Sequence, residues 1–252
     1  MRCNNTVGTS AFSTAQAGRF QRILREMLQR RKGEKLMATG ILLIGNTGAG
    51  KTTSFRNLNP AETLIINADK KPLSWRGWKK QYNAENKNYI VCDDAHKIQG
   101  YLKHISNNMP NIKVAIIDTL NGAMLAQEMT ERRNNTFDAW RDLATSIYGI
   151  LDMIGTLRED LTVICTAHAQ TEMTDGGYMF THMKTSGRKL EKIVPESKFT
   201  TVLHCKANDG KYVFEVHAKN STAKTPLGLY EEDEIDNDIT KVIAKLKEYE
   251  EG

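Results

Sequence analysis

A single eight-residue stretch limits what this chain can fold into. Residues 45–52 read Gly-Asn-Thr-Gly-Ala-Gly-Lys-Thr and match the pattern G-x-x-x-x-G-K-[ST] at every specified position. The pattern suits phosphate because its glycines let successive backbone N–H groups point at phosphate oxygens, and the following helix adds the positive end of its dipole. The apolar run 40–44 precedes it, as expected of a strand buried on both faces. We therefore predict a strand, a phosphate-binding loop and a helix.

Side chains within this loop have separate expected roles. The ammonium group of Lys51 can reach the β- and γ-phosphates of a nucleotide, and the hydroxyl of Thr52 can ligate Mg²⁺. ATP with Mg²⁺ is the cofactor pair that this chemistry implies. The predicted nucleotide-binding residues are Gly45, Asn46, Thr47, Gly48, Ala49, Gly50, Lys51, Thr52 and Thr53.

A metal at Thr52 needs a second acidic group to hold it through water. Asp118 ends the apolar run 114–117, where the aspartate of a Walker B motif belongs. We predict Thr52 and Asp118 as the metal-site residues. The next residue is Thr119 and not the glutamate that often activates water, so a base for ATP hydrolysis must lie elsewhere in the chain.

Downstream of the loop, short apolar runs alternate with stretches of helical periodicity. Strands are predicted at 40–44, 63–67, 113–117 and 161–166, and helices at 50–59, 95–105, 137–157 and 239–246. Residues 169–187 show little periodicity and contain the pair Gly176-Gly177, which predicts a long loop. The runs 199–206 and 211–218 flank a turn signal and predict a hairpin. The pattern indicates an α/β fold with a mainly parallel sheet flanked by helices and a C-terminal antiparallel hairpin at one edge.

Charge divides the chain into segments of different character. Residues 1–36 hold eight basic and two acidic residues, whereas the remainder holds 27 basic and 28 acidic residues. The net charge of +5 therefore belongs to the N-terminal extension and says little about nucleic-acid binding by the body. We predict three parts: a basic extension 1–36, a core 37–230, and an acidic segment with a terminal helix at 231–252.

The extension 1–36 has three interpretations. It can be a mitochondrial transit peptide, because it is Arg-rich, amphipathic and poor in acidic residues. It can also be an arm for oligomerisation or nucleic-acid binding. We favour a start of translation at Met37, because this residue lies three positions before the first strand and Lys32-Gly33-Glu34 can be encoded as a ribosome-binding sequence. We then expect the protein in the cytoplasm of a bacterial or phage-infected cell.

Composition excludes several classes of protein. At 40% hydrophobic and 26% charged residues, the chain is typical of a globular protein and not of a disordered one. No apolar run approaches 18 residues, so we expect neither a membrane-spanning helix nor a membrane partner. The four cysteines are far apart and lack zinc-ligand or redox spacing, which favours a reducing interior.

Four motifs at the ends of predicted strands occur in an order that resembles the RecA/RadA core. They are the loop 45–52, Ile65-Ile66-Asn67-Ala68-Asp69, Ile116-Ile117-Asp118-Thr119-Leu120-Asn121-Gly122 and Val163-Ile164-Cys165-Thr166-Ala167-His168. The likeness spans residues 38–230 and is greatest to small RecA-like ATP-binding proteins of phage recombination and replication modules. It implies a RecA-like P-loop NTPase fold, slow DNA-dependent ATP hydrolysis and a homo-oligomer, a ring or filament, on single-stranded DNA. A single-strand DNA-binding protein is a further implied partner.

The same resemblance implies roles for single residues. Asp69 falls where RecA proteins carry a glutamate that polarises the attacking water. His168 falls where they carry a polar residue, most often Gln, that senses the γ-phosphate and leads into a DNA-binding loop. Lys219 falls where a lysine crosses to the γ-phosphate of the neighbouring subunit, and Lys224 is the reserve candidate. The predicted catalytic residues are Lys51, Asp69, Asp118, His168 and Lys219.

The second DNA-binding loop of the RecA family corresponds to residues 169–187. This segment and the residues after it combine aromatic side chains with cations. Such a mixture suits single-stranded nucleic acid, because rings stack on bases while cations follow the phosphates. The predicted DNA-binding residues are Tyr178, Phe180, Lys184, Arg188 and Lys189.

Together these features favour an ATP-binding, ATP-hydrolysing protein that acts on single-stranded DNA in recombination or replication. Two alternatives stay open. A nucleotide or small-molecule kinase would use the same phosphate-binding loop, although residues 169–187 lack the arginines of a kinase lid. A nucleotide-gated DNA-binding mediator would bind ATP without hydrolysing it, which an aspartate at position 69 leaves open.

Overall fold

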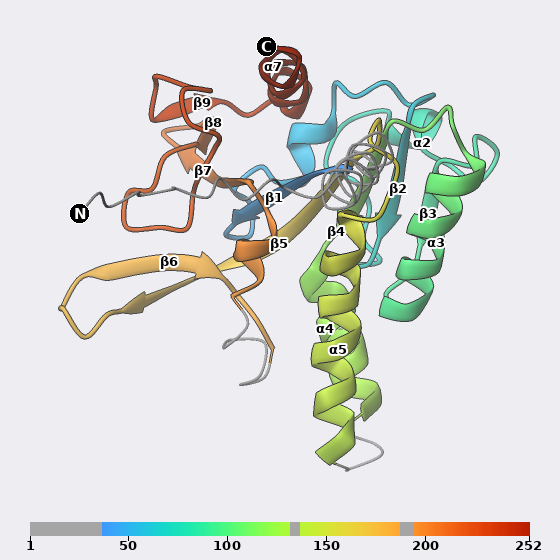
Figure 1. Ribbon diagram of the computed structural model, residues 1–252, viewed down its shortest axis with the longest axis horizontal. Helices are drawn as coiled ribbons and strands as arrows, with labels where there is room; N and C mark the ends of the chain where they lie inside the picture. Colours follow the sequence, from blue (N-terminus) through green and yellow to red (C-terminus); the bar gives the residue numbers. More distant parts are fainter. Residues whose placement is uncertain (1–36, 132–136, 187–193) are drawn as a thin grey trace, which may run out of the picture. The chain divides into compact units, whose positions relative to one another are not determined.

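The computed structural model describes residues 37–131, 137–186 and 194–252, whose arrangement is shown in Figure 1. The extension 1–36 and the predicted DNA-binding residues Arg188 and Lys189 lie outside the described residues. Within the described ranges, no helix is both long enough and apolar enough to cross a membrane.

A mainly parallel sheet forms the centre of the described chain. In spatial order its strands are β3 (Tyr89–Val91), β2 (Thr63–Asn67), β4 (Val114–Asp118), β5 (Thr162–Met173), β1 (Thr39–Gly45), β7 (Thr201–Asn208), β8 (Lys211–Glu215) and β9 (Glu234–Asp236). Neighbours from β3 to β7 are parallel, and β8 and β9 are antiparallel additions at one edge. The predicted fold class is therefore confirmed, with β5 between β1 and β4.

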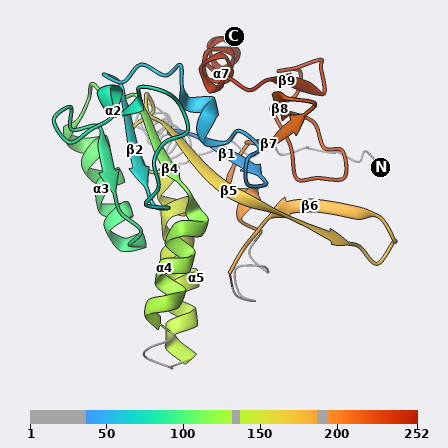
Figure 2. The ribbon, with the colours of Figure 1, turned by 180° about the vertical axis from the view of Figure 1, so that it is seen from behind.

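The two faces of the sheet carry different helices, as Figures 1 and 2 show from opposite sides. The helices α3 (Ala95–Asn108), α4 (Leu120–Glu131) and α5 (Phe137–Ile154) contribute to the core on one face. The 3₁₀ helix η1 (Thr52–Phe55), the short α2 (Trp78–Gln81) and α7 (Ile239–Glu251) lie on the other. A second 3₁₀ helix, η2 (Pro195–Lys198), leads into β7.

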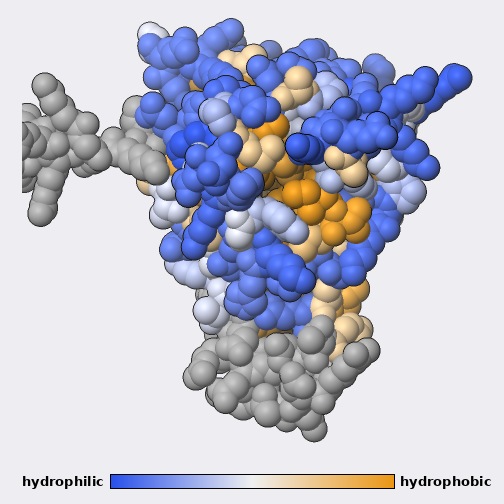
Figure 3. Space-filling view, turned by 90° about the vertical axis from the view of Figure 1, so that its right-hand side faces the viewer, coloured by the Kyte–Doolittle hydropathy of each residue, from blue (hydrophilic) through white to orange (hydrophobic). Residues whose placement is uncertain are grey.

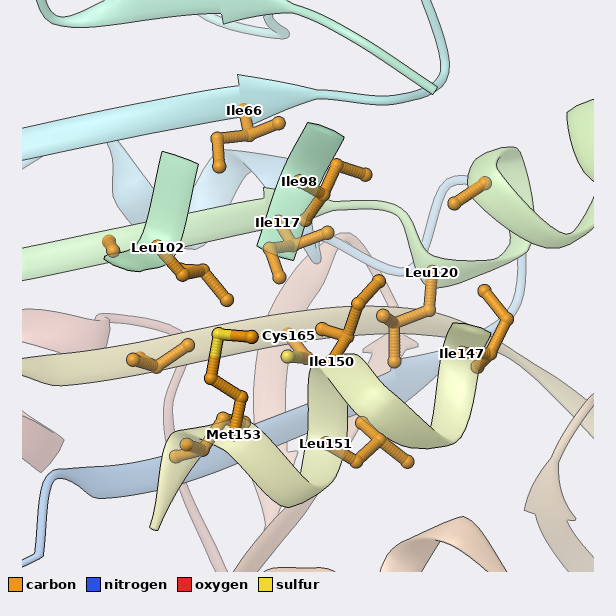
Figure 4. Close-up of a cluster of buried hydrophobic side chains, with 14 of the residues drawn as sticks. Ile66, Ile98, Leu102, Ile117, Leu120, Ile147, Ile150, Leu151, Met153 and Cys165 are labelled. Atoms are coloured by element: carbon orange, nitrogen blue, oxygen red, sulfur yellow. The ribbon is translucent and has the colours of Figure 1, made fainter. Parts of the chain in front are cut away.

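Alternation along the strands explains why there are two core clusters. In β1, Leu42 and Ile44 belong to the cluster on the α3–α5 face, and Ile41 and Leu43 belong to the cluster on the α7 face. Burial on both faces is the reason that these strands read as continuous apolar runs. Figure 4 shows the first cluster, where Ile98 and Leu102 of α3 and Ile147, Ile150 and Leu151 of α5 surround Ile66, Ile117 and Cys165 of the sheet.

Residues 169–187, predicted as a long loop, contain a hairpin. β5 continues to Met173, and β6 (Met179–Met183) pairs antiparallel with residues 169–173. Gly177 has a φ of +78° in the turn, where the Thr174 N–H donates to the Tyr178 carbonyl at 2.9 Å. The prediction was wrong because nearly all residues of this ribbon are exposed or only partly buried, so the alternation that marks a strand with one buried face is missing. We call residues 169–183 the hairpin arm; it extends away from the main sheet in Figure 1.

The predicted helix at 50–59 is also wrong, because only the four-residue 3₁₀ helix η1 forms there. The run Thr52-Thr53-Ser54 has low helix propensity, and the Ser54 hydroxyl donates to the Lys51 carbonyl at 2.6 Å. The Arg56 and Asn57 side chains instead bond to residues 237 and 238. These two bonds hold residues 56 and 57, just after the phosphate-binding loop, against the C-terminal segment.

Several short elements had no counterpart in the prediction. They are β3, α2, α4 and β9. β9 lies inside the acidic segment and pairs with β8, and α7 packs against the sheet, so residues 231–252 share the core of the strands. The side that carries α2, β3 and α3 is mainly hydrophilic with a restricted apolar area (Figure 3), which does not indicate a broad docking surface.

Candidate functional site

The carboxyl ends of the central parallel strands meet at one edge of the sheet. Gly45 at the end of β1 lies opposite His168 of β5, and Asn67 at the end of β2 lies opposite Asp118 of β4. The loops that leave these strands carry the phosphate-binding motif and Asp69. The register of the sheet thus brings together four segments that are far apart in the sequence. This edge is the candidate functional site.

The phosphate-binding loop has the conformation that its glycines permit. Gly48 and Gly50 have φ angles of +81° and +91°, in the left-handed region that other residues disfavour. A Cβ atom at Gly45 would lie 2.8 Å from the Cys205 carbonyl oxygen, so β1 passes β7 too closely for any side chain there. The Ala49 N–H donates to the Asn46 carbonyl at 3.1 Å and closes the turn.

Lys51 lies inside this loop and is only 7% exposed. Its ammonium group donates to the carbonyl oxygens of Gly45 at 2.7 Å and Asn46 at 3.0 Å. Burial lowers the pKa of Lys51, while the neighbouring Asp118 acts in the opposite direction. The loop therefore holds a cation among backbone groups, which is the environment that phosphate oxygens require.

Asp118 is almost fully buried, at 1% exposure, and each of its carboxylate oxygens accepts a hydrogen bond. The Thr52 hydroxyl donates to Oδ2 at 2.8 Å, and the Thr166 hydroxyl donates to Oδ1 at 2.7 Å. Burial raises the pKa of Asp118, and the two hydroxyl bonds offset part of this rise. The structure thus brings Thr52 and Asp118 together and adds Thr166, which the prediction did not include.

These oxygens fit Mg²⁺, which prefers hydroxyl, carboxylate and phosphate oxygens and keeps several waters. Among the described residues, no group of three or more His, Cys, Asp or Glu side chains could hold a metal ion by itself. Mg²⁺ is usually held by one or two carboxylates together with substrate phosphates, so Thr52 and Asp118 would supply only part of its ligands.

Asp69, which follows β2, has both carboxylate oxygens engaged. The Thr119 hydroxyl donates to Oδ1 at 2.6 Å, and Lys71 Nζ pairs with Oδ2 at 2.5 Å. Burial acts to raise the pKa of Asp69, but the bonds from Lys71 and Thr119 outweigh it and lower the pKa. A Cβ atom at Gly122 would lie 2.7 Å from Oδ1, so glycine is required where α4 approaches Asp69. Lys71 was not predicted, because it reads as part of a turn.

His168 lies where β5 leaves the main sheet for the hairpin arm. Its N–H donates to Asn121 Oδ1 at 2.7 Å, and its carbonyl accepts from the Lys184 N–H at 2.7 Å. Burial and the charge of Lys51 lower the pKa of His168, and Asp69 acts to raise it. The half-buried imidazole therefore lies within the electrostatic reach of the phosphate-binding lysine and of the candidate base.

The described part of the predicted DNA contact lies on or just after the hairpin arm. Tyr178 is exposed at its turn, and Phe180 stacks on His182 with ring centroids 6.4 Å apart. Lys184 follows β6 and is exposed. Residues 169–186 also carry Glu172 and Asp175, and Lys184 is their only lysine or arginine. The arm therefore presents aromatic and apolar side chains together with two carboxylates, and its sequence contains no lysine or arginine.

Lys219 has a partner within its own chain. Its ammonium group pairs with Asp233 at 2.7 Å and is about half exposed, and this bond raises the pKa of Lys219. Lys224 exchanges two backbone hydrogen bonds with Val202, so it extends from a fixed position beside β7. A role for either lysine in a neighbouring subunit stays a prediction.

A cavity of about 560 Å³ lies at the opposite edge of the sheet, at the amino ends of β1, β2 and β4. Its charged lining includes Lys113 and Asp160, which pair with each other at 2.6 Å. None of the predicted site residues lines this cavity. Its size therefore does not make it the functional site, because the phosphate-binding chemistry lies at the carboxyl ends of the strands.

Comparison with known proteins bears on the same part of the chain. A family model described as an AAA domain matches residues 37–227, about three quarters of the 252 residues. The matched range contains the phosphate-binding loop, Asp69, Asp118 and His168. No curated protein matches the chain.

Proposed function

The chain belongs to the family of AAA domains, which are nucleotide-binding ATPases, and from this premise we propose that it couples ATP binding and hydrolysis to single-stranded DNA. The proposed process is recombination or replication of the phage type, in a ring or filament of identical subunits that can cooperate with a single-strand DNA-binding protein. The order of strand-end motifs, which resembles RecA/RadA proteins, supports this finer assignment.

The observation that carries the proposal is the continuity of β5. The same strand holds Thr166, bonded to Asp118, then His168 beside Lys51, and then the first half of the hairpin arm up to Met173. A displacement of β5 at His168 must move the arm, because residues 169–173 are paired with β6 along their whole length. Nucleotide contacts at one end of the strand can therefore change how its other end meets DNA.

The residues at the phosphate site have complementary proposed roles. Lys51 and the backbone of residues 45–52 bind and orient the phosphates, and Asp69 takes a proton from the attacking water. Thr52 and Asp118 hold Mg²⁺, which when bound neutralises charge on the phosphate oxygens. Lys219 would serve a neighbouring subunit after leaving Asp233.

The aromatic side chains of the arm supply the proposed DNA contact. Tyr178 is exposed, and Phe180 with His182 forms a stacked pair on which a base can continue the stack. Because the arm carries Glu172 and Asp175 and the nearest lysine, Lys184, follows it, we assign affinity at the arm mainly to stacking. This predicts weak sequence preference, since every base has a π face.

The test is ATP hydrolysis with and without single-stranded DNA, in chains 1–252 and 37–252. We expect stimulation by DNA in both chains and its loss in Lys51→Ala. A nucleoside monophosphate that stimulates turnover while DNA does not would refute the proposal and favour a kinase.

A second candidate, a mediator that binds ATP without turnover, is favoured by one observation. Both oxygens of Asp69 are already bonded, to Thr119 and Lys71, which weakens Asp69 as a base. Phosphate release separates the two functions. A mediator shows ATP-dependent DNA binding with no release above background, whereas the ATPase releases phosphate faster when DNA is added.

A further inference from the structure

The sheet order determines which way a nucleotide must lie across the phosphate-binding loop. Asp69 follows β2, while Asp118 and His168 belong to β4 and β5, and these three strands all lie on one side of β1. In the proposed function these residues serve the γ-phosphate, its metal and the attacking water, so the γ end of the triphosphate lies on that side. The α-phosphate and the nucleoside must then leave on the other side of β1, toward β7, β8 and β9.

Two side chains contact the loop from that other side. A Cβ atom at Gly50 would lie 2.9 Å from the Tyr212 ring and 3.2 Å from Asn237 Nδ2, so both touch the loop backbone. Tyr212 comes from β8, and Asn237 follows β9. Tyr212 is 45% exposed, which leaves ring surface for another planar group, whereas Asn237 is 3% exposed.

The Asn237 side chain is buried with neither polar atom satisfied. Its Oδ1 and Nδ2 have no hydrogen-bond partner among the described residues, although its backbone N–H and carbonyl are both bonded. The Asn237 N–H donates to the Tyr212 carbonyl at 3.3 Å, and its carbonyl accepts from Arg56 Nη1 at 2.8 Å. Arg56 also donates to the carbonyl of Thr53, the last residue of the predicted nucleotide-binding set, at 3.1 Å.

An unpaired buried amide is destabilising, and such groups are rare in folded proteins. Asn237 has a fixed backbone and an unpaired side-chain amide. This amide can therefore bind a ligand that offers both a hydrogen-bond donor and a hydrogen-bond acceptor. The Watson–Crick edge of a purine has this combination, and a tyrosine beside it offers the ring on which bases stack.

We propose that Tyr212 and Asn237 form the base-binding part of the nucleotide site, with Tyr212 stacking on a purine and the Asn237 amide pairing with its edge. This rests on the proposed function, because it assumes that the loop binds a nucleoside triphosphate. Because Asn237 is buried next to Tyr212, a base can reach its amide only if the Tyr212 ring rotates away from it. The acidic segment then contributes to substrate binding through Asn237.

The amide also sets the expected base specificity. Adenine presents a donor and an acceptor on adjacent atoms, and guanine presents the same pair in reversed order. Because none of the residues that the structure describes bonds the Asn237 amide in one orientation, rotating the amide by half a turn matches it to either base. The site therefore accepts purines as a class, and ATP and GTP should bind within about threefold of each other.

Calorimetric titration with Mg²⁺ and ATP, GTP or inorganic tripolyphosphate tests this proposal. Tripolyphosphate occupies the loop without a base. We expect Tyr212→Ala to weaken ATP and GTP binding about tenfold and to leave tripolyphosphate binding unchanged, since stacking on one ring has this magnitude. Tyr212→Phe keeps the ring and should bind as the unmodified chain does. Asn237→Ala should weaken both nucleotides without affecting tripolyphosphate.

Tyr249→Ala is the matched control, because Tyr249 lies on α7 with 46% exposure. Unchanged ATP binding in Tyr212→Ala overturns the proposal, as does an equal loss for ATP and tripolyphosphate. A large preference for ATP over GTP overturns the assignment of purine specificity. The proposed DNA function fails separately: hydrolysis then ignores DNA while Tyr212→Ala still weakens nucleotide binding.

Discussion

The phosphate site and the hairpin arm share the strand β5 but differ in what surrounds them. At the phosphate site, charged groups are buried and bonded, as Lys51 is to two carbonyls and Asp118 is to two hydroxyls. On the arm, Met173 and Tyr178 are more than half exposed. Function at the first region therefore depends on exact placement by the core. Function at the second depends on the type of side chain presented, and single changes there should have smaller effects.

The largest expected effect tests the first half of this comparison. Lys51→Ala should lower the turnover number for ATP by about 10³-fold, because it removes the cation that faces the transferred phosphate. Its free energy of unfolding should not fall, because burial of the charge, which lowers the pKa of Lys51, is itself unfavourable. Steady-state kinetics and urea unfolding measure both quantities.

The control is Lys103→Ala, an exposed lysine of α3 that should behave as the unmodified chain. If Lys51→Ala unfolded at much lower urea, the ammonium group would be a structural support of the loop. The phosphate site would then contribute to the stability of the fold as well as to catalysis, contrary to the comparison drawn above.

Asp69→Asn should lower the turnover number for ATP by roughly 10²–10³-fold, within the range of general-base catalysis. The amide cannot take a proton from water, yet its size preserves the contact with Thr119. Affinity for ATP should change little, because Asp69 does not bind the phosphates in this scheme. Single-turnover kinetics separate the two quantities. Equal losses in affinity and turnover would show that Asp69 positions the nucleotide instead of acting as a base.

A third prediction concerns the junction where the arm joins the sheet. The Thr222 N–H donates to the Thr181 carbonyl of β6 at 3.0 Å, and its hydroxyl lies 3.5 Å from His204 Nε2. The Met183 N–H donates to Glu196 Oε1 at 2.7 Å. His204 is buried, and burial lowers its pKa to about 4. These hydrogen bonds attach the arm to the main sheet next to His204, whose imidazole is neutral above about pH 4.

This lowered pKa has a defined consequence for stability. His204 is neutral in both folded and unfolded chains above pH 6.5, but below that pH the unfolded chain takes up a proton that the folded chain refuses. The stabilising contribution is thus lost as pH falls from 6.5 to about 4, by about 3 kcal/mol. Among the charged neighbours of His204, Glu215 acts to raise its pKa, and Lys206 and His182 act to lower it further. Glu196 also lies where the arm joins the sheet.

Urea unfolding at pH 7, 5.5 and 4 tests this value in the unmodified chain and in His204→Gln. The variant should lose about 3 kcal/mol less than the unmodified chain between pH 7 and pH 4, since glutamine has no proton to gain. Other titrating groups cancel in the difference. Parallel pH dependences would show that His204 is accessible to water, and the junction would then resemble the exposed arm more than the buried site.

Sequence patterns could predict the phosphate site better than the arm for a physical reason. The loop 45–52 needs glycines at positions with positive φ, and the strands around it are buried on both faces. Glycines and continuous apolar runs in the sequence therefore predict this part of the structure correctly. Thr166 and Asn237 act through partners that are remote in sequence and contributed by other elements, whereas Lys71 pairs with Asp69 only two residues away and was missed because it reads as part of a turn. Only the register of the sheet shows which residues meet, and no local pattern contains that register.

The arm was misread because neither of its faces is buried enough to impose alternation. Two glycines that form its turn were taken as the sign of a loop. The acidic segment is a similar case: its sequence predicted only the terminal helix, whereas β9 and Asn237 also lie against β8 and the phosphate-binding loop. In both segments, pairing with a strand elsewhere in the fold determines the structure.

The smallest expected effect tests the second half of the comparison. Tyr178→Ala should weaken binding to single-stranded DNA about tenfold, which is the value of one base stacked on one ring. The dependence of affinity on salt should stay the same, because no cation is removed and each phosphate contact contributes to that slope. Fluorescence anisotropy with labelled oligonucleotides at several salt concentrations measures both, with Tyr249→Ala as the control. A change in slope would show that the arm holds the backbone of DNA, and its aromatic surface would then serve another purpose.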